Sequence, residues 1–110
     1  MKTILVILAV CFSQVLFSQQ AKKQTVIIQT SAQCDDCKER IEGALNYTKG
    51  VKFADLDLET KKVTVQFLTK KTSIETIKAI IAKIGYDADD LKADISAVQK
   101  LPKCCQPNWH

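Results

Sequence analysis

The sequence predicts a single α+β domain in which the elements follow the order strand, helix, strand, strand, helix, strand. The chain has 110 residues, a length that suits one domain and excludes a two-domain enzyme. Its hydrophobic residues make up 46% and its charged residues 25%, with few glycines and prolines, so most of it is expected to fold. Apolar residues alternate between a strand-like and a helix-like period along the chain, which indicates both kinds of element.

The first strand and the first helix are predicted within residues 24–47. Val26, Ile27 and Ile28 form a short β-branched run, which is typical of a central strand buried on both faces. After a loop over 31–36, apolar residues recur at spacings of three and four and predict a helix that ends near Tyr47. The residues on this apolar face are Cys37, Ile41, Ala44 and Leu45.

Residues 51–58 and 63–67 alternate between apolar and polar side chains and predict an antiparallel hairpin. Its turn, residues 59–61, contains neither Gly nor Asn, so turn chemistry does not fix where each strand ends.

A second helix is predicted after Thr72 or Ser73, either of which can cap it, and Gly85 is expected to end it. A short last strand then follows at residues 86–88. Together these elements predict a ferredoxin-like βαββαβ sandwich, with a four-stranded antiparallel sheet and two helices on one of its faces.

Residues 92–110 are predicted to form a short C-terminal helix and a cysteine-containing tail. Asp94 can cap the helix and Pro102 ends it. We define the tail as residues 102–110; it carries Cys104 and Cys105, here called the tail pair.

Residues 1–18 are typical of a signal peptide, followed by a linker at 19–24. A short basic start precedes an apolar run from Ile4 to Phe17, which is shorter than the about 20 residues needed to cross a membrane. We therefore expect a periplasmic protein without a membrane span in its mature form. Secretion and lipid attachment at Cys11 are the alternatives.

The net charge of +4 is spread over alternating basic and acidic residues instead of forming a basic stripe. We therefore expect no nucleic-acid partner. Lysine pairs at 22–23, 61–62 and 70–71 are interpreted as ordinary solvated surface.

Cys34 and Cys37, here called the first pair, form a Cys-x-x-Cys motif where the first strand meets the first helix. Free amides at a helix N-terminus, with Lys38 and Arg40 nearby, are expected to favour thiolate over thiol. Two thiolates suit soft ions such as Cu(I) or Hg(II). By spacing alone, a structural disulfide is equally compatible with this motif.

Three segments resemble the heavy-metal-associated domain family: Ser31-Ala32-Gln33-Cys34-Asp35-Asp36-Cys37, then Gly50-Val51, then Ala79 to Gly85-Tyr86-Asp87-Ala88. The resemblance covers residues 25–91. The family comprises copper chaperones, modules of metal-exporting ATPases and a periplasmic mercury-binding protein. The resemblance implies that Cys34 and Cys37 are metal ligands and that the partner is a metal-exporting ATPase or another thiol-bearing protein.

The chain departs from the family pattern at three positions around the first pair. Ala32 stands where the family usually has a methionine that packs under the metal loop. Asp35 and Asp36 either are solvated or offer oxygen ligands, which would shift preference toward Zn(II) or Cd(II). Tyr86 matches an aromatic that bacterial members place beside the loop, where it either shields the site or packs in the core.

The tail pair has two interpretations. Cys104 and Cys105 either join the first pair, giving three or four thiolates, or belong to a disordered end whose thiols oxidise. His110 alone is interpreted as solvated.

The sequence thus predicts an exported, monomeric, non-enzymatic metal-binding protein, a metallochaperone or scavenger. It is expected to bind Cu(I) in preference to Hg(II), Zn(II) or Cd(II) and to pass the ion on by thiolate exchange. The alternatives are a thiol-disulfide redox protein that uses the same Cys34 and Cys37, and a structural domain held by disulfides.

Overall fold

The computed structural model describes residues 22–106, so the predicted signal peptide and His110 lie outside the described residues. Three strands and four helical segments follow one another along the chain. They are β1 (Lys23–Gln29), α2 (Asp35–Asn46), β2 (Val51–Asp57), β3 (Lys62–Leu68), α3 (Ile74–Lys83), α4 (Ile95–Lys100) and the 3-10 helix η1 (Lys103–Cys105).

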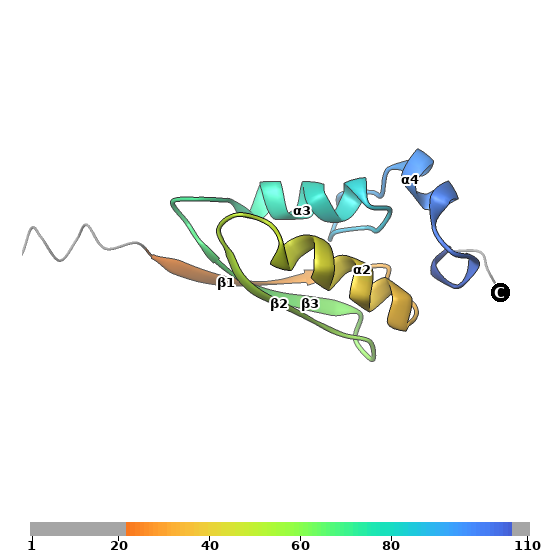
Figure 1. Ribbon diagram of the computed structural model, residues 1–110, viewed down its shortest axis with the longest axis horizontal. Helices are drawn as coiled ribbons and strands as arrows, with labels where there is room; N and C mark the ends of the chain where they lie inside the picture. Colours follow the sequence, from red (N-terminus) through yellow and green to blue (C-terminus); the bar gives the residue numbers. More distant parts are fainter. Residues whose placement is uncertain (1–21, 107–110) are drawn as a thin grey trace, which may run out of the picture.

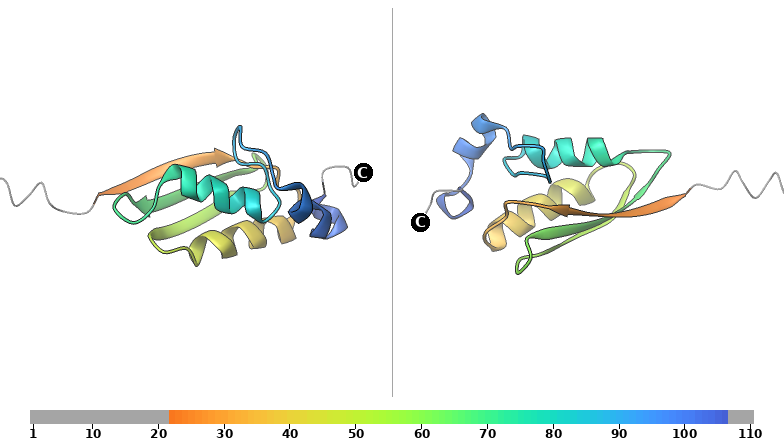
Figure 2. Two further views of the ribbon diagram at one scale, coloured as in Figure 1. Left: turned by 90° about the horizontal axis from the view of Figure 1, so that it is seen from above. Right: turned by 180° about the vertical axis from the view of Figure 1, so that it is seen from behind.

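The strands form an antiparallel sheet in the order β1-β3-β2. Helices α2 and α3 lie on one face of this sheet (Figure 1), and the view from above shows them side by side (Figure 2). The core lies between the two layers. Its largest fully buried side chains are Tyr86, Phe67, Ile28, Ile41, Leu45, Leu56, Ile77 and Ile81. The expected α+β class, with helices on one face of an antiparallel sheet, is confirmed.

The predicted hairpin is present as β2 and β3, with Ala54 opposite Val65 and Leu56 opposite Val63. Its turn is closed without glycine. Lys61 adopts a φ of 63° and donates its backbone N–H to the Asp57 carbonyl oxygen at 2.7 Å. Lysine seldom adopts this left-handed conformation, which explains why turn chemistry could not locate the strand ends.

The expected fourth strand is reduced to a single bridge, so within residues 22–106 the sheet has three strands. Ala88 pairs with Thr30 on one side but also with Leu91 of its own segment, because the chain reverses directly after it. Asp89 makes this reversal with a φ of 54°. A tight turn at this point leaves no extended segment that could pair along β1.

Strand β1 is consequently an edge strand of the observed sheet, and the prediction that it is buried on both faces is wrong. Ile28 points into the core and is fully buried, whereas Ile27 is 60% exposed. The helices cover only one face, so successive side chains of the strand meet core and solvent in turn.

Helix α3 begins and ends where the sequence predicts. The hydroxyl of Ser73 accepts a hydrogen bond from the Thr76 backbone N–H, and Gly85 follows the helix with a φ of 108°. Helix α2 ends at Asn46 with Tyr47 as its C-cap. Among residues 22–106, no helix combines the length and apolar character required to cross a bilayer.

Candidate metal centre

Thr30, which is almost fully buried, anchors the loop before α2. Its hydroxyl donates to the Lys61 carbonyl oxygen at 2.7 Å and accepts the backbone N–H of Ala32 at 3.2 Å. Ala32 itself is fully buried at the position where the family pattern has methionine. The loop is therefore fixed to the hairpin turn by hydrogen bonds.

The first pair lies at the start of α2. Cys34 is the N-cap residue, with extended backbone and no hydrogen bond from its side chain to the helix amides, and Cys37 lies in the first turn and is fully buried. Their Sγ atoms are 3.3 Å apart. All four cysteines of the described residues are free thiols.

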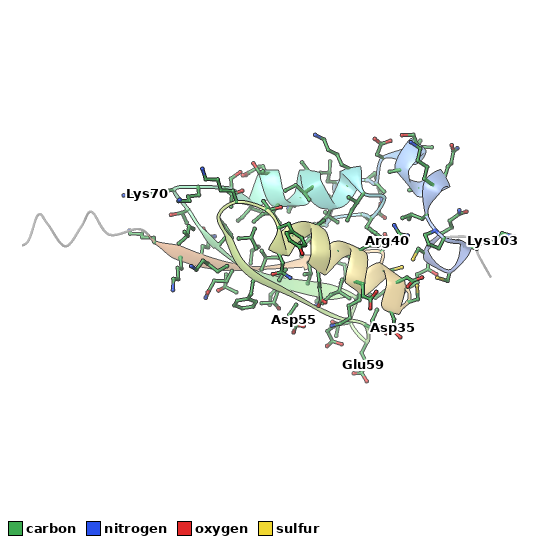
Figure 3. The ribbon with its side chains drawn as sticks, viewed as in Figure 1. Asp35, Arg40, Asp55, Glu59, Lys70 and Lys103 are labelled. Carbon is green, nitrogen blue, oxygen red and sulfur yellow. The ribbon has the colours of Figure 1, made fainter. Side chains whose placement is uncertain are left out.

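The tail returns to this same point and brings Cys104 and Cys105 against the first pair. The Sγ of Cys34 lies 3.0 Å from that of Cys104 and 3.4 Å from that of Cys105, and the Sγ atoms of Cys37 and Cys105 are 2.6 Å apart. In Figure 3 the yellow sulfur atoms gather between the start of α2 and the tail, beside the labelled Lys103. Of the two interpretations left open by the sequence, the geometry favours a tail pair next to the first pair.

Contacts outside the sulfur cluster hold the tail in place. The backbone N–H of Asp94 donates to the Ala82 carbonyl oxygen at 2.9 Å, which fixes the start of α4 to the end of α3. Leu101 is 6% exposed and packs against Gly85, where an added Cβ would lie only 3.0 Å from its Cδ1 atom. The amide of Gln33 then donates to the Gln106 carbonyl oxygen at 3.2 Å.

Tyr86 is fully buried, and its hydroxyl makes no hydrogen bond of good geometry to any described residue. Burial and the neighbouring Cys105 and Cys37 thiols raise the pKa of Tyr86 well above its ordinary value. Burial is also the main reason why the pKa of Cys105 is raised, followed by its contact with Cys37. Burial thus favours the protonated thiol at Cys105, and metal binding there would displace its proton.

Charged side chains around the first pair are arranged differently from the sequence expectation. Lys38 does not direct its ammonium toward the sulfurs: it pairs with Glu42 at 3.0 Å and with Asp55 at 3.5 Å, and donates to the Leu56 carbonyl oxygen. Glu42, with a smaller contribution from Asp55, raises the pKa of Lys38. This lysine connects α2 to β2.

Sequence reasoning missed the role of Glu42 in fixing α2 to the sheet. Its carboxylate accepts the Leu56 backbone N–H at 2.7 Å while it also pairs with Lys38. The spacing of four residues between Lys38 and Glu42 was the available signal.

Among the described residues, donor atoms of Cys34, Cys104 and Cys105 all lie within 4.8 Å of one another, as a shared metal ion requires. Asp35 and Asp36 are both exposed in the first turn of α2. In that position they complement the positive end of the helix dipole. A cysteine site of this kind, with no carboxylate in the group, suits a soft metal ion.

The profile of the heavy-metal-associated domain matches residues 23–87, which is more than half of the chain. The chain belongs to the heavy-metal-associated domain family. The resemblance noted in the sequence is thereby confirmed, and the observed fold is the fold of that family.

Relatives of this heavy-metal-associated chain include two proteins named for copper. The copper chaperone CopZ of Staphylococcus aureus is 36% identical over 64 residues, which are 58% of this chain and 94% of that protein. The copper-exporting P-type ATPase of Staphylococcus saprophyticus is 41% identical over 59 residues, 54% of this chain. Those residues span only 7% of the ATPase, so the likeness concerns one small part of it.

Solved structures give the same result. A structure of the CopZ metallochaperone aligns with a TM-score of 0.58 and 35% identity, covering 59% of this chain and 98% of that chain. Oxidised MerP from Ralstonia metallidurans aligns with a TM-score of 0.60 and 28% identity, covering 62% and 96%.

Proposed function

We propose that this protein is an exported carrier that binds a thiophilic metal ion, Cu(I) above others, through Cys34 and Cys37 and passes it on without catalysing a reaction. The observation that carries the proposal is the first pair itself, two free Sγ atoms 3.3 Å apart where the loop meets α2 in a heavy-metal-associated fold. The ion is cargo, and the protein supplies the ligands.

The choice of Cu(I) rests on the donor set and on the relatives. Thiolate sulfur prefers soft ions, and the two carboxylates between the cysteines are exposed on the helix surface. Mixed sulfur and oxygen ligation, the reason to consider Zn(II) or Cd(II), therefore has little support. Relatives named as copper chaperones favour copper, and the likeness to MerP makes Hg(II) the second candidate.

Transfer by ligand exchange follows from low coordination numbers. A two-coordinate ion leaves room for an incoming thiolate, so one metal–sulfur bond forms before another breaks and the ion is not released into water. No electrons move, and the departing thiolate takes up a proton from solvent. Because similar domains occur in copper-exporting ATPases, we propose such a domain as the exchange partner.

Export is proposed from residues 1–18 alone. Fractionation of cells that produce the full chain should place the mature protein in the periplasm and show that it lacks these residues by mass. A full-length product retained in the cytoplasm would overturn this part of the proposal.

An anaerobic titration tests the binding function directly. Reduced protein is expected to bind Cu(I) stoichiometrically in competition with a chromogenic chelator, and the Cys34→Ser/Cys37→Ser variant should lose this binding. The loss is expected because both thiolates of the first pair are removed, while serine keeps the size of each side chain.

The matched control is Asp35→Asn/Asp36→Asn, which changes the two residues between the cysteines and keeps all thiols. It should leave stoichiometry and sulfur ligation unchanged, because both acids are exposed. Circular dichroism establishes that each variant is folded. The proposal is wrong if the reduced wild-type chain ignores Cu(I) and Hg(II), or if the cysteine variant binds as the wild-type chain does.

A further inference from the structure

We propose that Cys104 and Cys105 are ligands of the same cargo ion, so that the tail closes the site and the ion is held by three or more thiolates instead of two. This inference rests on the proposed function, because it assumes that the first pair binds the ion. The tail thiolates would occupy the coordination positions that a partner's thiolates would otherwise take, and would thereby control release of the ion.

The sulfur positions are the first support. Cys34 is the centre of the cluster, since its Sγ lies within 3.4 Å of each of the other three. With metal–sulfur bonds of about 2.3 Å, as in zinc thiolate sites, sulfurs are about 4.6 Å apart in linear ligation and about 3.8 Å apart in tetrahedral ligation. Four of the five observed separations, 2.6 to 3.4 Å, are shorter than both values, and the fifth is 3.9 Å, so these sulfurs can share one ion by moving slightly apart and no long movement of the tail is required.

The second support is that the fold presents the tail pair independently of the sulfurs. Cys105 is only 2% exposed, and its backbone N–H donates to the Pro102 carbonyl oxygen at 2.8 Å within η1. The Gln106 amide donates to the Leu101 carbonyl oxygen at 2.9 Å. These bonds shape η1, and the Gln33 amide bond to the Gln106 carbonyl oxygen together with Leu101 packing against Gly85 attaches it to the domain.

The third support is the Tyr86 hydroxyl. This fully buried group faces the Cys105 and Cys37 thiols, but it makes no hydrogen bond of good geometry to them or to any other described residue. A buried hydroxyl without a partner costs free energy, and a charged acceptor is a stronger partner than a neutral one. A metal-bound thiolate of Cys105 or Cys37 would supply such an acceptor.

Closure by the tail has a direct consequence for transfer. An acceptor's thiolate must take the place of a tail thiolate: its bond to the metal forms as a tail sulfur–metal bond breaks, no electrons are exchanged, and the freed thiolate is protonated by water. The complete chain is therefore expected to retain the ion more tightly, and to release it more slowly, than a chain without the tail thiols.

The experiment compares the wild-type chain with Cys104→Ser/Cys105→Ser, each reduced, loaded with one equivalent of Cu(I) and held at a concentration where it is monomeric. X-ray absorption should give three or more sulfur neighbours for the wild-type chain and two for the variant. Competition with a Cu(I) chelator should show at least a tenfold weaker affinity for the variant, and release to the chelator should be faster.

Two further variants make the comparison decisive. Lys103→Ser changes the same short helix without removing a thiol, and it should match the wild-type chain in sulfur number and affinity. Because Cys105 is buried, its replacement risks a local change in packing. The single Cys104→Ser variant removes a less buried thiol and should lower the sulfur number by itself.

Failure of this inference differs from failure of the proposed function. Equal sulfur numbers and affinities in the wild-type and tail variants would overturn the role of the tail while leaving binding by the first pair intact. Absence of Cu(I) binding in every protein would overturn the proposed function itself.

Discussion

The two cysteine pairs meet at one point, but the fold supports them very differently. The first pair belongs to α2, a helix of 12 residues whose Ile41 and Leu45 are fully buried in the core. The tail pair follows α4, which has six residues and no buried side chain, and depends on Leu101 and a few main-chain hydrogen bonds. The first pair therefore shares the stability of the domain core, whereas the tail pair has its own, weaker attachment.

The largest effect is expected from weakening the core under the first pair. Ile41→Ala should lower the free energy of unfolding of the reduced, metal-free protein by about 3 kcal/mol, because it removes a fully buried side chain and leaves a cavity. Urea denaturation followed by circular dichroism measures this. Because α2 belongs to the core, both pairs should be lost in one transition. A change below about 1 kcal/mol would show that α2 is not fixed by its core contacts.

An intermediate effect should come from Gly85→Ala, which acts where the tail is attached. The position has a φ of 108°, and the added methyl group would meet Leu101. We expect a loss of about 2 kcal/mol in unfolding free energy. We also expect faster hydrogen exchange at the Cys105 and Gln106 amides than in α2.

Gly43→Ala is the matched control for this variant. Gly43 lies inside α2, and a Cβ there would have no atom within 4 Å. The same substitution should therefore raise the free energy of unfolding by about 0.5 to 1 kcal/mol. Equal destabilisation of both variants would show that contact with Leu101 is not the cause of the loss at Gly85.

The smallest expected effect concerns Asp89, in the turn that leads toward α4. Its carboxylate accepts the Gln29 backbone N–H at 2.9 Å and pairs with Lys78 at 3.2 Å. The hydrogen bond from Gln29, with help from Lys78, lowers the pKa of Asp89 below its ordinary value of 3.8. Because the side chain is partly exposed, Asp89→Ala should cost only about 1 kcal/mol at neutral pH.

The stability lost in Asp89→Ala should depend on pH in one direction. A carboxyl group whose pKa is lowered by folding stabilises the protein fully above the pKa of the unfolded state. The difference between the wild-type chain and Asp89→Ala should stay constant from neutral pH to about pH 5, then shrink as the pH falls through the pKa of the folded state. Asp90→Ala is the control, because that side chain is 95% exposed and comes no nearer than 4.0 Å to Lys78. Its free energy of unfolding should differ little from that of the wild-type chain.

The parts of the fold predicted correctly from sequence are those in which the pattern is local. The alternation in β2 and β3, the cap at Ser73 and the stop at Gly85 each depend on a few neighbouring residues, and each is present. The predicted fourth strand was wrong because Asp89 reverses the chain in a left-handed conformation; the one local signal was that aspartate tolerates this conformation better than most residues do.

The candidate site shows the same limit. The position of the first pair at the start of α2 follows from short-range periodicity and was predicted. The place of the tail pair depends on Leu101 packing against Gly85 and on the Gln33 hydrogen bond to Gln106, which join residues far apart in the chain. No local pattern encodes such contacts, so the sequence could offer both interpretations of the tail without deciding between them.

One of the two tyrosines of the chain is buried and the other is exposed, and this contrast makes them a pair of internal probes for fluorine NMR. Tyr86 is enclosed beside the sulfur cluster, whereas Tyr47, the C-cap of α2, is 92% exposed. Fluorine placed on both rings therefore yields one resonance that responds to cargo loading and a second that stays as an internal reference.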